Sequence, residues 1–409
     1  MAFETKPLRN WKLNLAAAWT AQFLCIIGFN AAFPFMPFYI RDLGVTDPDG
    51  VKLWTGMIAS AGPISMMLVS PIWGLMADRR GRKLMVERAT FGGAVIIVLM
   101  AFAGNVHQLF ILRLIQGMLT GTIPAFVTLV ASFAPASEAG FALGMMQMAV
   151  FTGASVGPLL GGVIADALGY RWAFIWTGVM LAVAGVLVWK VVQEGYAPPK
   201  ERKAQTGLAD SARTIAHSAP VLGAVVALGG IYMANQASRP MMPLLVEMLQ
   251  PDPSLVNTAV GTVYGASAIA SALSAVVVGR IADRTGHRAA LVACAVGAAL
   301  AYMGQAFAPT VTLLIVWAFG TGLFSGGLAP AANAILASTV PREQQGAVYG
   351  LSNSVNAAGR AIGPMIGAAV ATGIGLRASF VTTAGLLGIV AVWVAAAVRP
   401  RQPSAGQRE

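Results

Sequence analysis

Residues 74–83 read Gly-Leu-Met-Ala-Asp-Arg-Arg-Gly-Arg-Lys, and residues 279–288 read Gly-Arg-Ile-Ala-Asp-Arg-Thr-Gly-His-Arg. The second decapeptide repeats the first at an offset of 205 positions in a chain of 409 residues. Each copy lies between two long apolar segments, where a short charged segment fits a turn at the edge of a membrane. The repeat therefore predicts a membrane protein made of two equivalent halves.

Composition leads to the same class independently. Hydrophobic residues make up 57% of the chain and charged residues 11%, with a mean hydropathy of +0.71. Soluble domains carry roughly 25% charged residues, so this chain cannot cover a water-facing surface. At roughly 20 to 25 residues per spanning helix, about twelve helices leave room for loops only. The composition excludes a separate soluble catalytic domain.

The predicted fold is an all-α membrane protein of twelve spans in two six-helix bundles. We expect an N-terminal bundle over 1–192, a polar linker over 193–217 and a C-terminal bundle with a short tail over 218–409. The apolar segments that define the spans are 13–39, 53–76, 84–104, 108–132, 140–166, 172–192, 218–244, 257–280, 289–308, 311–337, 346–372 and 378–398.

The repeat extends beyond the decapeptides. The segment 34–37 matches 240–243, the glycines at 117 and 121 match those at 322 and 326, and 153–158 matches 359–364. These registers agree within one residue across whole halves. Duplication in parallel orientation relates two bundles by an axis along the membrane normal, with a substrate site between them near the midplane.

The net charge of +11 is distributed unevenly along the chain. Basic residues gather before the first span, in both decapeptides, around the linker and in the tail, whereas the opposite side keeps only Arg41, Lys52, Arg171 and Arg377. This distribution follows the positive-inside rule. It predicts that both termini are cytoplasmic, and it makes a nucleic-acid partner improbable.

The first decapeptide matches the pattern G-x-x-x-D-R-x-G-R-R/K, and its placement resembles the loop between helices two and three of major facilitator superfamily transporters. The resemblance implies that Asp78 lies against a helix N-terminus and latches the cytoplasmic ends of the halves when the carrier faces outward. The gating residues it implies are Gly74, Asp78, Arg79, Gly81, Arg82 and Lys83, with Asp283, Arg284 and Gly286 in the second copy. That second copy departs from the pattern at Arg280 and His287. The simpler alternative is a basic loop that only sets topology.

Arg113 to Gly117 resembles the family pattern R-x-x-Q-G. The resemblance implies that Arg113, like Asp78, takes part in proton coupling. Because Arg113 falls only about five residues into its span, the alternative is a side chain that extends toward the membrane surface.

Residues 153–162 match G-x-x-x-G-P-x-x-G-G, a signature that the family associates with exporters that exchange substrate for protons. The residues that carry it are Gly153, Gly157, Pro158 and Gly161. Glycines four residues apart open a flat helix face for close packing, and the proline adds a kink.

Polar and aromatic side chains within spans are candidates for lining the substrate cavity, because polar groups at such depth normally face a cavity or the bundle interior. The alternative is ordinary hydrogen bonding between helices. These candidates are Gln22, Asn30, Phe33, Gln116, Gln147, Tyr232, Asn235, Gln236, Arg239, Asn353, Asn356 and Arg360.

One departure from the multidrug pattern affects the expected cargo. Many proton-driven drug exporters place a carboxylate within the first span, where this chain has Asn30. A cavity with Arg239 and Arg360 and no central carboxylate has a positive field, which suits an anionic, zwitterionic or neutral substrate better than a cation.

The chain is thus expected to be a proton-coupled exporter of small organic molecules, resembling the twelve-helix drug:proton antiporter family. The alternatives are an organic-anion importer or exchanger that uses Arg239 and Arg360, and a transport-inactive sensor or scaffold. No nucleophile–base or metal-ligand spacing suggests an enzyme, a metal site or a cofactor, and Cys25 and Cys294 fit packing roles. We expect a monomer in a bacterial inner membrane.

Overall fold

The computed structural model describes residues 10–135, 137–194, 219–339 and 345–397, and these ranges are helical apart from short turns. The predicted linker lies outside the described residues except for Gln193 and Glu194. The all-helical membrane fold predicted from the sequence is confirmed. Eleven described helices are long and apolar enough to cross a membrane, and the remaining predicted span, 346–372, is also a helix (Gln345–Gly373).

The first half contains the six predicted spans, several of them divided by short irregular turns. Its elements are α1 (Trp11–Ala32), η1 (Phe33–Phe35), α2 (Met36–Asp42), α3 (Pro48–Arg80), α4 (Arg82–Glu87), η2 (Arg88–Gly92), α5 (Gly93–Ala101), α6 (Val106–Leu119), α7 (Thr122–Phe133), α8 (Ala139–Leu168) and α9 (Tyr170–Val191). The span predicted at 108–132 is interrupted before α7 at Gly121, whose φ of 121° favours glycine.

The second half repeats this order. Its elements are α11 (Ala219–Ala237), η3 (Arg239–Met241), α12 (Met242–Leu249), η4 (Pro253–Leu255), α13 (Val256–Thr285), α14 (His287–Phe307), α15 (Val311–Thr339), α16 (Gln345–Gly373) and α17 (Leu376–Ala397). The 3₁₀ turns η1 and η3 each carry a proline near their start and occupy equivalent places in the two halves. Proline lacks the amide donor that a continuous α-helix requires, which explains the turn at both places.

The expectation that the decapeptides are loops is corrected by the structure. Residues 74–80 form the last two turns of α3, and only Gly81, at a φ of 96°, turns the chain into α4. Gly286 does the same between α13 and α14 at a φ of 93°. The span prediction stopped too early because charged residues on the final turns lower the hydropathy while the helix continues.

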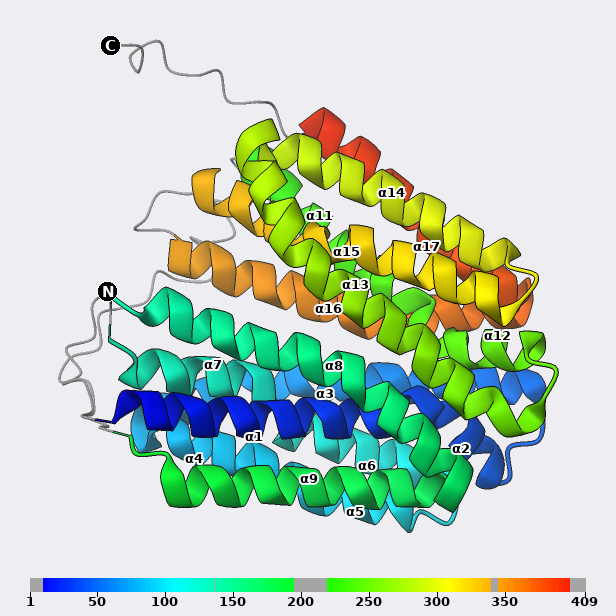
Figure 1. The fold of residues 1–409 in the computed structure, drawn as a ribbon, viewed down its shortest axis with the longest axis horizontal. Coiled ribbons are helices and arrows are strands. Elements are labelled where there is room, and N and C mark those ends of the chain that lie inside the picture. The colour runs from blue at the N-terminus through cyan, green and yellow to red at the C-terminus, as the bar shows by residue number, and fades with distance from the viewer. Residues whose placement is uncertain (1–9, 136, 195–218, 340–344, 398–409) are drawn as a thin grey trace.

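Helices pack within each half and across a seam between the halves. In the first half α1 packs against α8 and α9, and in the second half α11 packs against α16 and α17. The halves meet where α3 contacts α16 and where α8 contacts α13; Figure 1 shows α13 crossing toward one end of α8. We call the end of the bundle that holds Gly81 and Gly286 the decapeptide side, and the end that holds Pro48 and Leu168 the distal side.

Candidate substrate cavity

A cavity of about 230 Å³ lies between the two halves. Its walls come from α1, η1, α2, α3 and α6 of the first half and from α11, η3, α13 and α16 of the second. The lining residues are Phe29, Asn30, Phe33, Pro34, Met36, Pro37, Thr55, Ile58, Ala59, Pro63, Arg113, Gln236, Arg239, Pro240, Tyr264 and Pro364. A pocket between two bundles with mostly apolar walls and a few polar groups has the general character of a small-molecule site.

Arg113 is one of two cations that line this cavity. Its guanidinium lies over the Phe33 ring, 4.0 Å from the centroid. The Nε atom donates to the backbone oxygen of Ile58 at 3.3 Å, and Nη1 donates to the side-chain oxygen of Gln116. Gly62 makes room for it, since a Cβ atom there would lie 3.1 Å from the guanidinium carbon. The helix packing therefore places this charge against the cavity wall.

Arg239 is the second cation and belongs to η3 in the other half. Its Nη2 atom donates to Asn30 Oδ1 across the two halves at 3.4 Å. Its guanidinium lies 5.8 Å from the ring centroid of Tyr264, and its backbone oxygen accepts a hydrogen bond from the Tyr264 hydroxyl at 2.5 Å. Asn30 is held in turn by a hydrogen bond to the backbone oxygen of Ile26.

No carboxylate is among the residues that line the cavity. Within the described ranges, the ion pairs join Arg41 to Glu247, Lys52 to Asp49 and Lys83 to Glu87, and none involves a cavity cation. The cationic side chains meet aromatic rings instead, which attract cations more weakly than a carboxylate does. The cavity consequently has a net positive field.

Four of the sequence-predicted cavity residues meet in this space, namely Asn30, Phe33, Gln236 and Arg239. The other predicted residues are not among the lining residues. Gln116 is buried in α6, where it bonds Arg113 and Thr120. Gln22 and Asn356 are buried in α1 and α16, and Gln147 and Asn353 are exposed.

Arg360 and its neighbours form a separate polar group in the second half. Arg360 lies 4.3 Å from the ring centroid of Tyr232. Asn235 accepts hydrogen bonds from Tyr302 at 3.2 Å and from Ser325 at 3.4 Å. These contacts join α11, α14, α15 and α16, as the hydrogen-bonding alternative in the sequence anticipated. Arg360 does not line the cavity with Arg239.

Several lining residues were not identified as candidates. Tyr264 lies on α13, and Thr55 and Ile58 lie on α3; none of the three belongs to a motif that the sequence analysis used. A partial signal for the prolines was present, because the repeat of 34–37 at 240–243 places Pro34 and Pro240 in equivalent positions. Both line the cavity.

The distal side of the bundle is held together by polar contacts between the halves. Arg41 on α2 pairs with Glu247 on α12 at 2.5 Å. At the end of α8, Asp166 accepts hydrogen bonds from Asn257 at 2.7 Å and from Thr258 at 2.8 Å. Because Asn257 and Thr258 are in the first turn of α13, the carboxylate lies at the positive end of that helix.

The glycine–proline signature forms the apolar part of the same seam. Gly157 packs on α1, where a Cβ atom would lie 2.7 Å from the Ile27 oxygen, and Gly153 and Gly161 also pack closely on α1. Facing the other half, a Cβ atom at Gly261 would lie 2.5 Å from the backbone oxygen of Pro158. The signature residues thus bring α8 into close contact with both α1 and α13.

Glycines with open space around them occur at both ends of the bundle. A Cβ atom would meet no heavy atom within 4 Å at Gly74, Gly140, Gly144 or Gly279 on the decapeptide side, nor at Gly44, Gly169 or Gly375 on the distal side. The polar contacts and the close helix packing between the halves nevertheless hold the distal end closed.

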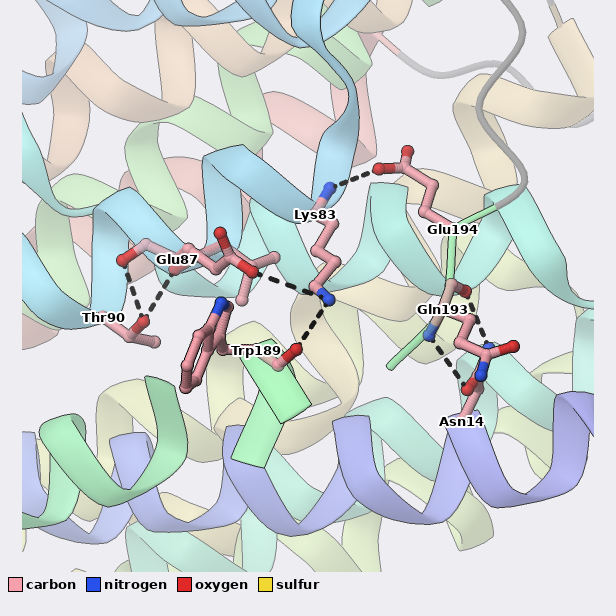
Figure 2. Close-up of polar contacts among 8 residues, drawn as sticks. Asn14, Lys83, Glu87, Thr90, Trp189, Gln193 and Glu194 are labelled. Carbon is pink, nitrogen blue, oxygen red and sulfur yellow. Dashed lines mark hydrogen bonds and ion pairs between the residues drawn. The ribbon is translucent and has the colours of Figure 1, made fainter. Parts of the chain in front are cut away.

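The first decapeptide turn is bound to the end of α9, as Figure 2 shows. Both oxygens of Glu194 accept backbone hydrogen bonds, one from Arg82 and one from Lys83, each at 2.8 Å. These amides open α4 and lack helical partners, so the carboxylate satisfies them and meets the positive helix end. The sequence predictions did not identify Glu194 as a functional residue.

Lys83 and Asn14 make further contacts at this turn. The Lys83 ammonium donates to the backbone oxygen of Trp189 at 2.8 Å and pairs with Glu87 at 3.8 Å. Asn14 on α1 donates to the Gln193 oxygen at 2.8 Å and accepts from the Gln193 amide at 3.2 Å. The first residues of the predicted linker are therefore bound to both α1 and α4.

Asp78 lies in the last turn of α3, which is the C-terminal end of that helix. The helix N-terminus that the family resemblance places beside Asp78 is therefore not that of α3. The side chain of Asp283 lies outside the described positions. Within the described ranges, no group of three or more His, Cys, Asp or Glu side chains is arranged to hold a metal ion.

Comparisons with known proteins agree with this architecture. The family model described as Major Facilitator Superfamily matches residues 18–250 and 224–409. The chain is 31% identical over 393 residues to a protein named multidrug resistance protein MdtG from Salmonella typhimurium, covering 96% of this chain and 97% of the relative. The protein of the same name from Escherichia coli O81 is 31% identical over 399 residues, covering 98% of each chain.

Solved structures share the fold at low identity. A bacterial homologue of the human lysosomal transporter Spinster, in an inward-facing and occupied conformation, superposes with a TM-score of 0.79 at 14% identity, covering 98% of this chain and 100% of that one. The nucleoside transporter NupG superposes with a TM-score of 0.75 at 14% identity, covering 96% of this chain and 100% of that one.

Proposed function

The chain belongs to the major facilitator superfamily and is a membrane transporter, and we propose that it exports small organic molecules in exchange for protons. The relatives that support export are named multidrug resistance proteins and match nearly the whole chain. In this proposal the two halves rock about the cavity and expose it to the two sides of the membrane alternately.

The orientation follows from the charges. Basic residues concentrate on the decapeptide side, so we place that side in the cytoplasm together with both termini. The membrane is proposed to be the bacterial inner membrane, and the working unit a single chain. In this orientation the described arrangement, closed distally, receives its cargo from the cytoplasm.

The observation that carries the export proposal is the seam built by the glycine–proline signature. Gly157 and Pro158 allow α8 to pack closely on α1 and α13 beside the cavity, which keeps the distal side closed while the carrier loads. A leak through this seam would return exported cargo to the cell, so tight packing there serves an exporter directly.

Proton coupling is assigned to Asp78 and Arg113 on the family resemblance. Asp78 lies near the decapeptide turn, where it is proposed to latch the cytoplasmic ends of the halves after cargo release. Arg113 lies between α3 and the cavity and reaches Gln116. The cavity itself offers no carboxylate to carry a proton, so coupling is expected to depend on these two residues.

Proteoliposomes that contain the purified chain and a trapped pH dye test this proposal. A pH gradient is imposed, and cationic, neutral and anionic compounds are added in turn. We expect cargo-dependent proton movement with at least one charge class, and much less with an Asp78→Asn variant that is equally well inserted. Cargo uptake or exchange without proton movement would support the organic-anion exchanger instead. Absence of flux with every compound in folded protein would support a transport-inactive relative.

A further inference from the structure

The cavity cations have unused hydrogen-bonding capacity. A guanidinium carries five N–H donors. In the described structure Arg113 uses one donor toward Ile58 and one toward Gln116, and Arg239 uses one toward Asn30. Both side chains line the same cavity, on opposite halves. The remaining donors can reach a molecule that enters between them.

No opposite charge accompanies either cation among the residues that line the cavity. Arg239 is exposed and Arg113 is partly buried, and partial burial of a cation is unfavourable unless an opposite charge accompanies it. Phe33 and Tyr264 supply ring faces, and Asn30 supplies a neutral oxygen, but none of these carries a negative charge. A bound anion would supply it.

We propose that the cavity binds a small organic monoanion, with its charged group between Arg113 and Arg239 and its apolar body against the aromatic and proline wall. This proposal rests on the proposed export function and specifies its substrate class. Planar carboxylate geometry matches the fork of guanidinium donors.

The apolar body has a defined place. Phe29, Phe33, Met36 and Ile58 line the space beside the cations, together with prolines from both halves. The volume of about 230 Å³ is below the roughly 300–1,000 Å³ typical of pockets that hold drug-sized ligands. A single aromatic ring with one carboxylate is a suitable probe for a pocket of this size.

Arg360 is assigned no part in this site. It lies against Tyr232 and is not among the lining residues. It therefore provides a matched control, because it is also an arginine within a spanning helix whose charge removal leaves the cavity cations in place.

The test uses three ligands of nearly equal size, namely benzoate, benzamide and benzylamine, which are anionic, neutral and cationic at pH 7. Binding to the purified, detergent-solubilised chain is measured by equilibrium dialysis with radiolabelled compound. We expect benzoate to bind at least about tenfold more tightly than benzamide, and benzylamine to bind most weakly, since opposite charges stabilise and like charges repel at short range.

Variants then locate the charge effect. Arg239→Gln should reduce benzoate binding about tenfold or more while leaving benzamide within about threefold, and Arg239→Lys should restore part of the preference because the charge returns. Arg360→Gln should keep the preference. Asn30→Asp places a carboxylate beside Arg239 and should shift preference away from benzoate, which tests the site without removing the arginine. Size-exclusion profiles verify folding of each variant.

The outcomes separate the two proposals. Equal binding of all three ligands, tightest binding of benzylamine, or equal losses for benzoate and benzamide in Arg239→Gln would overturn the anion site. Charge-selective binding with no flux of any compound in proteoliposomes would overturn export and leave the site standing. Flux of cations alone would overturn the site and leave export standing.

Discussion

The two halves line the cavity with equivalent segments that carry different chemistry. Pro34 and Pro240 occupy matching positions at an offset of 206 residues, and so do Asn30 and Gln236; all four line the cavity. Phe33, however, corresponds to Arg239. In the first half the ring lies on η1 and the cation on α6, whereas in the second half the cation lies on η3 and the ring on α13.

The seams between the halves, in contrast, have stayed alike. Gly56 faces the Pro364 oxygen, where a Cβ atom would lie at 2.9 Å, and Gly261 faces the Pro158 oxygen, where it would lie at 2.5 Å. The same constraint applies in both halves, because in each a glycine packs directly against a backbone oxygen of the other half. Side chains that face the cavity are free of that constraint, so the duplicated frame has come to hold an asymmetric site.

The decapeptide turns show the same division. Lys83 donates to the Trp189 oxygen, and Arg288 donates to the Ala395 oxygen at the equivalent place. Glu194 reinforces the first turn, whereas the sequence places Arg399 and Pro400 at the corresponding positions of the second half. The first turn therefore has a carboxylate anchor, whereas the corresponding positions of the second half carry no carboxylate.

The largest effect on transport is expected from neutralising the aspartate of each decapeptide in turn. Asp78→Asn should lower transport roughly 10- to 100-fold, the range of typical coupling energies between states, because the proposed latch depends on its charge. Asp283→Asn, in the degenerate second copy, should cost several-fold less. Initial rates in proteoliposomes with matched protein content measure both. Equal losses would show that the two decapeptides act as equivalent latches.

Overpacking the seam should have the same effect whichever half carries the substitution. Gly56→Val and Gly261→Val each force a side chain against a backbone oxygen of the other half, at a cost of about 1–3 kcal/mol typical of overpacking. Both should favour the distally open state. Labelling an Ala59→Cys variant with a membrane-impermeant maleimide from the distal side should then accelerate several-fold in both backgrounds. Acceleration in one background alone would mean that the halves separate unevenly.

A smaller effect is expected at the anchored turn. Glu194→Gln should lower the free energy of unfolding by about 1 kcal/mol, the usual contribution of a helix-capping side chain. Glu138→Gln is the matched control, because Glu138 likewise lies at the start of a helix but makes no side-chain capping bond. Thermal unfolding in detergent compares the two variants. An equal decrease in both would attribute the effect to charge alone.

The smallest effect is expected at the peripheral ion pair. Arg41 and Glu247 are 40% and 37% exposed, and such pairs contribute at most about 1 kcal/mol. Glu247→Gln should leave transport within about twofold of the parent chain. Asp166→Asn should have a larger effect, since Asp166 accepts two hydrogen bonds from the other half. A greater loss at Glu247 would reverse this order of importance at the distal seam.

The fold was largely predictable because the internal repeat and the apolar segments are visible in the sequence. The ends of helices were less predictable, since α3 continues through Arg79 and Arg80 after the apolar segment has ended. For the site, Arg239 and Arg360 look alike in the sequence, as each follows a polar stripe on its helix. Only the placement of η3 and α16 in the bundle shows that Arg239 lines the cavity whereas Arg360 lies against Tyr232.

Contacts between residues far apart in the chain were also not predictable. Glu194 accepts a hydrogen bond from the Arg82 amide across 112 positions, and no local sequence pattern indicates such a bond. Tyr264 was missed because its importance comes from its contact with Arg239, which depends on how α13 crosses η3.

The absence of carboxylates from the cavity lining has an electrical consequence. Moving one elementary charge across a membrane is worth about 2.3 kcal/mol per 100 mV, which corresponds to roughly a 50-fold concentration ratio. In a cell that is negative inside, the membrane potential supplies this free energy when a monoanion leaves. It supplies the same amount again when a proton enters in exchange. With the proposed anionic cargo, each one-for-one cycle moves two charges, so voltage alone, without a pH gradient, would drive export.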